Sequence, residues 1–182
     1  MGCTVALVQV FINIQQSRIT IDPLTQINNR SRLLQHLDKA LARQKGSPER
    51  QLYLFMIDID DFKQINDRYG HLEGDRALIC LADALKDAAA ECKCLIARFG
   101  GDEFAVAMEP KSEEEVTRFQ EELRRFLAMH NAAMETPYTI HISIGCTRCT
   151  PEHTSIPALI QAADKALYQA KAAGKQSRAN LH

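Results

Sequence analysis

Apolar residues along the chain follow two patterns, one typical of helices and one typical of strands. In residues 29–44 they recur every three or four positions, which predicts an amphipathic helix. Residues 52–59 form a nearly continuous apolar run, as in a strand that is buried on both faces. Further elements are expected as helices at 60–68, 74–90, 111–130 and 156–173, and as strands at 95–99, 104–108 and 138–146. Their order predicts a mixed α/β domain with an antiparallel component in its sheet.

Glycine and proline residues indicate where several of these elements end. The Gly-Ser-Pro sequence at residues 46–48 should stop the first helix. Residues 69–71 should separate two consecutive helices. Gly174 is expected to form the C-terminal cap of the last helix. The Gly100-Gly101 pair is expected at the tip of a hairpin.

Composition and charge are those of an ordinary globular domain. The chain has 182 residues, of which 46% are hydrophobic and 25% are charged, which favours one domain with a short appendage. It carries 22 Lys and Arg against 23 Asp and Glu, for a formal net charge of −1. Because binders of nucleic acid polymers usually carry a basic excess, we expect no such partner.

Six cysteines are too few to form a disulfide scaffold in a chain of this length, so we interpret them as thiols in a reducing compartment. Structural zinc is an alternative, because two closely spaced pairs occur and His153 could add a ligand. Apolar, strand-like sequence adjoins both pairs, which favours ordinary thiols; the pairs are Cys92–Cys94 and Cys146–Cys149.

Residues 1–21 form an N-terminal segment with two interpretations. Its apolar stretch at residues 5–14 is shorter than the ~20 residues that a membrane span needs. It could be an amphipathic helix that packs on a partner, with apolar residues near heptad spacing at Val5, Val8, Ile12 and Ile19. It could also be the trailing end of a transmembrane helix. We favour an origin in a longer, membrane-tethered protein with an upstream sensor, and we expect this fragment to be soluble and cytoplasmic.

Acidic residues gather at the ends of two predicted strands. The buried strand ends in Asp58, Asp60 and Asp61, and Asp102-Glu103 lies on the hairpin. If the two strands are neighbours in the sheet, these carboxylates converge on one edge and suit Mg²⁺ with a phosphate substrate. The alternative is that they are turn residues and helix caps, such as Asp60 or Asp61 at the start of the following helix.

Glycines and lysines near these carboxylates suggest a phosphate ligand. Gly100-Gly101 removes side chains where a large ligand could approach the backbone. The first turn of the helix at 60–68 offers free N–H groups, and Lys63 lies in it. Lys171 and Lys175 share a helix face and could also reach phosphate, although exposed lysines are usually only solvated.

Asn66, His71 and Asp75 form a third polar cluster. A guanine edge presents N–H donors, so the carboxylate of Asp75 is a suitable acceptor and the Asn66 amide could add selectivity. The alternatives are an N-cap for the helix at 74–90, an exposed Asn, and a turn histidine.

Five blocks of the sequence resemble the motifs of the GGDEF domain family, in the family's order from about residue 20 to 176. Residues 98–104 read Arg-Phe-Gly-Gly-Asp-Glu-Phe, the signature after which the family is named. The other blocks that are similar to family motifs lie at residues 22–30, 58–67, 70–75 and 163–171.

The resemblance implies a diguanylate cyclase, which condenses two GTP into cyclic di-GMP and two pyrophosphates. It implies an α+β fold with a mostly antiparallel five-stranded sheet wrapped by helices, similar to nucleotide cyclase catalytic and polymerase palm domains. The catalytic domain would occupy residues 22–178 and act as a homodimer. The full-length protein would lie at the cytoplasmic face of a bacterial inner membrane.

The resemblance also implies roles for individual residues. Asp58, Asp102 and the Ile59 carbonyl would bind Mg²⁺ or Mn²⁺, two ions per site. Asp102 would also be the base for the attacking 3′-hydroxyl, with Glu103 as the neighbouring acid. The substrate-binding set would comprise Asn66 and Asp75 for guanine, His71 and Phe62 in the same pocket, and Lys63, Lys171 and Lys175 for phosphates.

Three positions depart from the family pattern. Gln26 stands where glycine is common, and Lys175-Gln176 replaces a closing Arg-Asn. Glu91 and Cys94 occupy the Arg and Asp positions of the product-inhibition site, so we expect no such feedback. A non-catalytic GTP-binding regulatory module is the alternative function, and the intact signature favours the enzyme.

Overall fold

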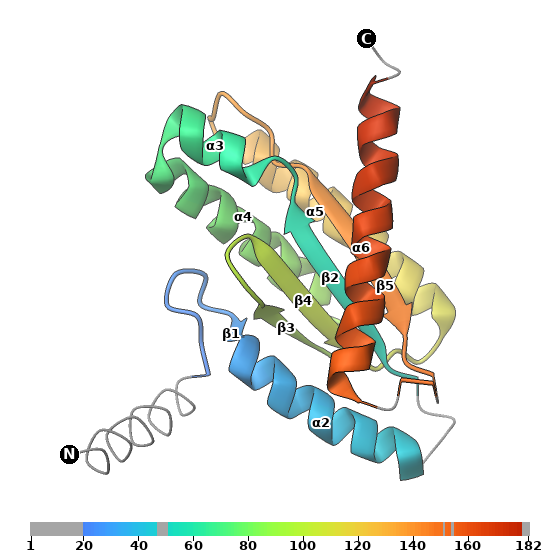
Figure 1. Cartoon of the computed structure of the whole chain (residues 1–182). Helices are drawn as coiled ribbons and strands as arrows, with labels where there is room; N and C mark the ends of the chain where they lie inside the picture. The colour runs from blue at the N-terminus through green and yellow to red at the C-terminus, as the bar shows by residue number, and fades with distance from the viewer. Residues whose placement is uncertain (1–19, 47–50, 151, 154, 180–182) are drawn as a thin grey trace, which may run out of the picture.

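The structure, a computed structural model, describes residues 20–46, 51–150, 152, 153 and 155–179 (Figure 1). The predictions for the N-terminal segment therefore fall almost entirely outside the described residues. Among the helices that are described, none combines the length and apolar character needed to cross a membrane.

The described part of the chain contains five helices and five strands. The helices are α2 (Arg30–Gly46), α3 (Phe62–Tyr69), α4 (His71–Ala89), α5 (Glu113–Ala133) and α6 (Ile156–Ala179). The strands are β1 (Asn28–Asn29), β2 (Tyr53–Ile59), β3 (Cys94–Arg98), β4 (Glu103–Met108) and β5 (Ile142–Arg148).

The strands form one sheet in the order β1-β3-β4-β2-β5. The short β1 runs parallel to β3, and the other three pairings are antiparallel. The prediction of a mostly antiparallel five-stranded sheet is therefore confirmed. The hairpin expected around Gly100-Gly101 is also confirmed, because β3 and β4 pair on either side of it.

Helices cover both faces of the sheet, which explains the continuous apolar run in β2 (Figure 1). Phe55 and Ile57 pack on the side of α4 and α5, whereas Leu54 and Met56 pack on the side of α2 and α6. Each such side chain contributes about 1.5–3 kcal/mol of hydrophobic stabilisation when fully buried. The central strand is thus held rigidly, and its polar end at Asp58 is held with it.

Helix α4 begins at His71, three residues before the predicted start. Gly70 alone separates it from α3, with φ at 89°, and its carbonyl accepts the first backbone hydrogen bonds of α4, from Glu73 and Gly74. Asp75 therefore lies inside the helix, and the interpretation of Asp75 as an N-cap is wrong.

Strand β5 begins at Ile142, four residues later than predicted. Side chains satisfy the backbone of the preceding segment, because Asn131 bonds both the N–H and the carbonyl of Ile140 at 2.9 Å. The Tyr138 hydroxyl lies 2.9 Å from the Glu73 carboxylate and ties the segment to α4. Alternation in the sequence here reflects packing on a helix and not strand pairing.

Helix α6 continues through Gly174 to Ala179, so the predicted C-cap at Gly174 is wrong. Gly174 lacks the positive φ of a helix-ending glycine. One glycine costs about 1 kcal/mol relative to alanine in a helix interior, and the alanine-rich sequence before it favours the helix.

Candidate active site

Two acidic residues face each other at the edge of the sheet where β2 ends and β4 begins. Asp58 is paired with Glu103 in the antiparallel register, and Asp102 precedes Glu103 directly. The side chain of Asp58 is buried, with 6% of the residue exposed. The convergence that the sequence predicted for neighbouring strands is therefore present.

The surroundings shift the pKa values of both paired carboxyls upward. Burial raises the pKa of Asp58, and the charge of Asp102 adds to this effect, against a hydrogen bond from Lys171. Burial likewise raises the pKa of Glu103, followed by the charge of Asp58. Ionised carboxylates at this edge therefore need a cation beside them.

Lys171 supplies a cation to the edge from α6. Its Nζ lies 2.7 Å from Oδ2 of Asp58. The helix reaches this place because Gly145 of β5 lets it pack directly on the strand backbone. A Cβ at Gly145 would lie 2.2 Å from the Leu167 nitrogen and 2.6 Å from the Ala163 oxygen.

The turn that carries Asp102 is fixed by backbone and side-chain hydrogen bonds. The carbonyl of Glu103 accepts from the N–H groups of Phe99 at 2.8 Å and Gly100 at 3.2 Å. A Cβ at Gly100 would lie 2.9 Å from Oε2 of Glu103, whereas one at Gly101 would meet no atom within 4 Å. Gly101 thus leaves the open space for a ligand that the sequence suggested.

Arg98 links this turn to the start of the domain, a role that sequence reasoning missed. Its Nε and Nη2 donate to the Gly101 carbonyl at 3.1 and 2.7 Å, and its Nη1 lies 3.3 Å from Asp22. Asp22 also accepts the N–H and hydroxyl of Thr25. The available signal was that Asp22 and Arg98 each open a motif block.

The pKa of Asp22 is lowered although the carboxyl is partly buried. Burial tends to raise this pKa, but the hydrogen bonds from Thr25 together with the Arg98 charge outweigh burial and lower it. Gln26, in the same turn, adopts a left-handed φ of 57°, which explains why glycine suits this position. The Gln26 side chain donates to the Pro23 carbonyl at 2.6 Å.

Asp60 and Asp61 belong to the turn that leads into α3. Oδ1 of Asp60 accepts a hydrogen bond from Ser143 at 2.7 Å. Asp61 has a φ of 56° and precedes the first helical residue, but its side chain makes no capping hydrogen bond. The turn interpretation therefore suits these two residues. Ile59, 1% exposed, pairs with Ile142 at the last position of β2.

The residues predicted to contact guanine lie on the two helices that follow β2. The amide of Asn66, on α3, packs on Gly74 of α4, where a Cβ would come within 2.1 Å of Oδ1. Asn66 is thus brought beside the residue that precedes Asp75. His71 is exposed at the first position of α4, and the half-buried Phe62 packs against the core.

The remaining predicted phosphate ligands are placed differently from Lys171. Nζ of Lys63 lies 2.7 Å from Asp67, four residues along α3. The side chain of Lys175 lies outside the described part of the structure. Of the two predicted lysines whose side chains the structure describes, Lys171 contacts the Asp58 carboxylate and Lys63 contacts Asp67.

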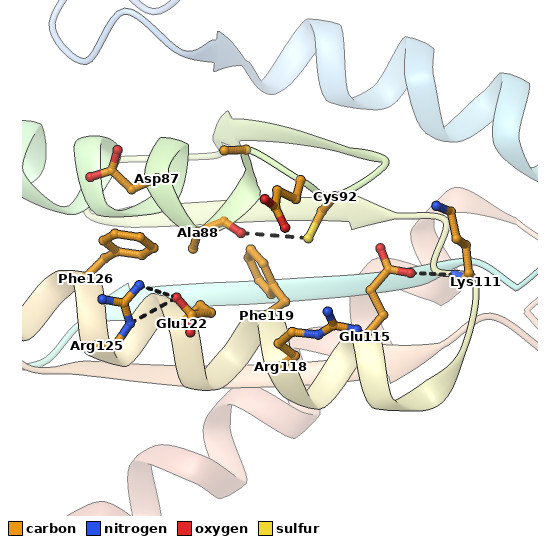
Figure 2. A pocket seen from close by; sticks show the side chains of 12 residues that line it. Asp87, Ala88, Cys92, Lys111, Glu115, Arg118, Phe119, Glu122, Arg125 and Phe126 are labelled. Carbon is orange, nitrogen blue, oxygen red and sulfur yellow. Dashed lines mark hydrogen bonds and ion pairs between the residues drawn. The ribbon is translucent and has the colours of Figure 1, made fainter.

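A separate hollow of about 590 Å³ lies between the end of α4 and α5 (Figure 2). Glu91, at one of the positions that depart from the expected product-inhibition motif, lines the hollow, and Cys92 is its neighbour. The adjacent Arg125 is paired with Glu122. Four acidic and three basic residues line the hollow: Asp87, Glu91, Glu115, Glu122, Lys111, Arg118 and Arg125.

Within the described ranges, no three His, Cys, Asp or Glu side chains form a group that could hold a metal ion. The zinc interpretation of the cysteine pairs therefore gains no support. A divalent metal at the sheet edge would need the two carboxylates Asp58 and Asp102 together with a backbone carbonyl or substrate oxygens.

Comparisons with known proteins agree with this geometry. A family model described as "Diguanylate cyclase, GGDEF domain" matches residues 19–177. Diguanylate cyclase DgcP of Pseudomonas aeruginosa is 36% identical over 162 residues, which cover 88% of this chain and 24% of that protein. Diguanylate cyclase DosC of Escherichia coli is 34% identical over 172 residues, which cover 92% of this chain and 36% of that protein. The chain thus spans about a quarter to a third of these relatives.

Solved structures show the same likeness. The coiled coil and GGDEF domain of DgcB from Caulobacter crescentus, in complex with c-di-GMP, aligns with a TM-score of 0.78 at 27% identity. That alignment covers 95% of this chain and 91% of the other. The active GGEEF domain of a diguanylate cyclase from Vibrio cholerae aligns with a TM-score of 0.73 at 32% identity. That alignment covers 82% of this chain and 94% of the other. With its signature turn placed beside the buried Asp58, the chain belongs to the diguanylate cyclase GGDEF domain family.

Proposed function

We propose that this domain is a diguanylate cyclase that condenses two GTP molecules into cyclic di-GMP and releases two pyrophosphates. The observation that carries the proposal is the buried Asp58 paired with Glu103, beside Asp102 and in contact with the Lys171 ammonium. Membership of the family and the names of the relatives support the same activity.

The chemistry of the edge fits a hard divalent cation, Mg²⁺ or Mn²⁺, with two ions per site. Asp58 already contacts a cation, the ammonium of Lys171. Asp58, Asp102 and the Ile59 carbonyl would hold the metal, because such ions prefer oxygen ligands. When bound, the metal supplies charge neutralisation at the phosphates and favours ionisation of the attacking hydroxyl.

Asp102 is proposed to accept the proton of the 3′-hydroxyl of one GTP. The 3′-oxygen then forms a bond to the α-phosphorus of the second GTP, and the bond from that phosphorus to pyrophosphate breaks. The same step in the other direction closes the ring. Glu103 lies beside Asp102 and supports the metal site. Positioning and charge neutralisation provide most of the catalysis in such transfers.

The two helices after β2 are proposed to read the base. The Asp75 carboxylate would accept the N1–H and N2–H groups of guanine, and the Asn66 amide would add a further hydrogen bond. His71 and Phe62 would line the same pocket. Lys63, Lys171 and Lys175 would bind phosphates, and for Lys63 this requires release from Asp67.

Each domain is proposed to hold one GTP, so catalysis requires a homodimer that places two nucleotides face to face. The proposed domain spans residues 22–178, and an upstream sensor would control pairing in a protein tethered at the cytoplasmic face of a bacterial inner membrane. No nucleic acid polymer is expected as a partner.

Product inhibition is proposed to be absent. Glu91 lines the hollow between α4 and α5 in place of a guanidinium, and Cys94 replaces an aspartate at the start of β3. A dianionic cyclic dinucleotide would meet an acidic side chain there. Initial rates should therefore be unchanged when cyclic di-GMP is added at the start of the reaction.

The test is to incubate the domain, fused to a dimerising coiled coil, with GTP and Mg²⁺ and to identify the nucleotides by mass spectrometry. Cyclic di-GMP with two pyrophosphates per product supports the proposal. GTP that binds without turnover would instead indicate the non-catalytic regulatory module.

A further inference from the structure

The contact between Lys171 and Asp58 places an ammonium on a carboxylate that is proposed to bind metal. Nζ of Lys171 lies 2.7 Å from Oδ2 of Asp58, and the Asp58 side chain is 9% exposed in this pair. The Lys171 side chain is 36% exposed, so one side of it faces solvent. The pair is therefore enclosed on the carboxylate side and open on the lysine side.

The charges around Asp58 explain why the carboxylate holds this ammonium. Asp102 and Asp60 act on Asp58 as negative charges, whereas Lys171 acts as a positive one. Glu103 is the partner of Asp58 across the sheet and adds another carboxylate. Without Lys171 the edge would carry several acids around a buried carboxylate.

Two other basic residues of the motif blocks, both with described side chains, are engaged elsewhere. Arg98 contacts Asp22 and the Gly101 carbonyl, and Lys63 contacts Asp67. Lys171 is also held in place by its helix, because the backbone of α6 packs on Gly145 at Leu167, one helical turn before Lys171. The ammonium is thus anchored near Asp58 and mobile only through its four-carbon side chain.

We propose that Lys171 is the internal counter-cation of the metal site and competes with a divalent metal ion for Asp58. A metal such as Mg²⁺ binds carboxylate oxygen at about 2.1 Å and repels a second cation on the same oxygen, so the ammonium must leave when the metal binds. Metal binding to the nucleotide-free domain is weakened accordingly.

The release of Lys171 has a consequence that rests on the proposed function. The freed ammonium becomes available to the phosphates of GTP, so the metal and the nucleotide favour each other's binding. The competition itself does not depend on GTP or on turnover. The competition can therefore be present in a domain that has no cyclase activity, and cyclase activity can be present without the competition.

The test is a titration of the nucleotide-free domain with Mn²⁺, in which electron paramagnetic resonance reports the free ion at mildly alkaline pH. Lys171→Met should bind Mn²⁺ about three- to tenfold more tightly than the wild type, because the competing charge is gone. Lys171→Arg keeps the charge and should bind like the wild type. Lys165→Met removes an exposed lysine of the same helix and is the matched control.

The same variants give a second measurement. Without Lys171, the metal-free domain should melt at a lower temperature, and Mn²⁺ should raise the melting temperature more than in the wild type. Asp58→Asn should remove the tight site and so assign the signal to this edge. Equal or weaker Mn²⁺ binding by Lys171→Met, or no Mn²⁺ binding by any of these proteins, would overturn the proposal.

Discussion

At the scale of single residues, the site depends on charges held at one end of a buried strand. Asp58 lies in the sheet, whereas Asp102 lies on the turn next to it. Burial raises the pKa of Asp58, so its charge needs partners. Asp102 is only half-buried on its turn, so each of the two carboxylates can be replaced on its own.

Asp102→Asn should abolish turnover without unfolding the domain. Loss of the proposed base should lower the rate of cyclic di-GMP formation by about 10²–10⁴-fold or more, because the amide cannot accept the hydroxyl proton. The partly exposed side chain of Asp102 lies outside the core, so the melting temperature should stay close to that of the wild type. Wild-type turnover by this variant would refute the role assigned to Asp102.

Asp22→Asn should show how much the charge of Asp22 stabilises the fold through its contact with Arg98. The native pKa of Asp22 is lowered from 3.8, so its charged form stabilises the fold above that pH. This contribution is lost as the pH falls through the native pKa. Urea unfolding should show a constant destabilisation by the variant from neutral to mildly acidic pH.

Below the ordinary pKa of aspartate the difference between Asp22→Asn and the wild type should shrink, because both side chains are then uncharged. Asp38→Asn removes an exposed carboxylate of α2 and serves as the control. A difference that grows toward acidic pH would mean that the Asp22 charge does not stabilise the fold.

At the scale of elements, the close packing of α6 on β5 decides where Lys171 lies. Gly145→Ala should lower the free energy of unfolding by at least about 2 kcal/mol, because the added Cβ collides with the α6 backbone and overpacks the contact. It should also weaken the contact between Lys171 and Asp58. Chemical denaturation measures the first effect.

The matched control for Gly145→Ala is Gly101→Ala. A Cβ at Gly101 meets no atom within 4 Å, and Gly101 lacks a positive φ, so its stability should change little. Equal free energies of unfolding for the two variants would show that α6 can move away from β5 without loss of stability.

Element types could be predicted from the sequence, because hydrophobic period distinguishes β2 from the helices around it. Some boundaries of these elements could not be predicted from the sequence. Ile140 alternates as in a strand but is hydrogen-bonded by the Asn131 side chain. Gly174 resembles a helix end, but the surrounding helix formers outweigh one glycine.

The candidate site was predictable where it depends on motif order and strand pairing. The pairing of Asp58 with Glu103 follows once β2 and β4 are neighbours. The contacts of Lys171 with Asp58 and of Arg98 with Asp22 were not predictable, because they depend on how distant elements cross the sheet. Local periodicity contains no information on such crossings.

At the scale of the whole molecule, the net charge of −1 conceals a separation of charges. Carboxylates gather at one edge of the sheet, and α6 brings a lysine to them from the face that it covers (Figure 1). The helices that follow β2 carry the residues proposed to read guanine. In the proposed reaction a single domain holds one nucleotide, so a second domain must lie opposite it.

The central claim is that two copies of this domain together make cyclic di-GMP from GTP. The most direct measurement is the initial rate of cyclic di-GMP formation per domain, with Mg²⁺, over a wide range of domain concentrations. We predict a rate per domain that rises with concentration for the isolated domain, and a rate that is independent of concentration when a coiled coil enforces pairing. Absence of cyclic di-GMP from the enforced dimer, or an equal rate per domain in dilute monomer, would contradict the account.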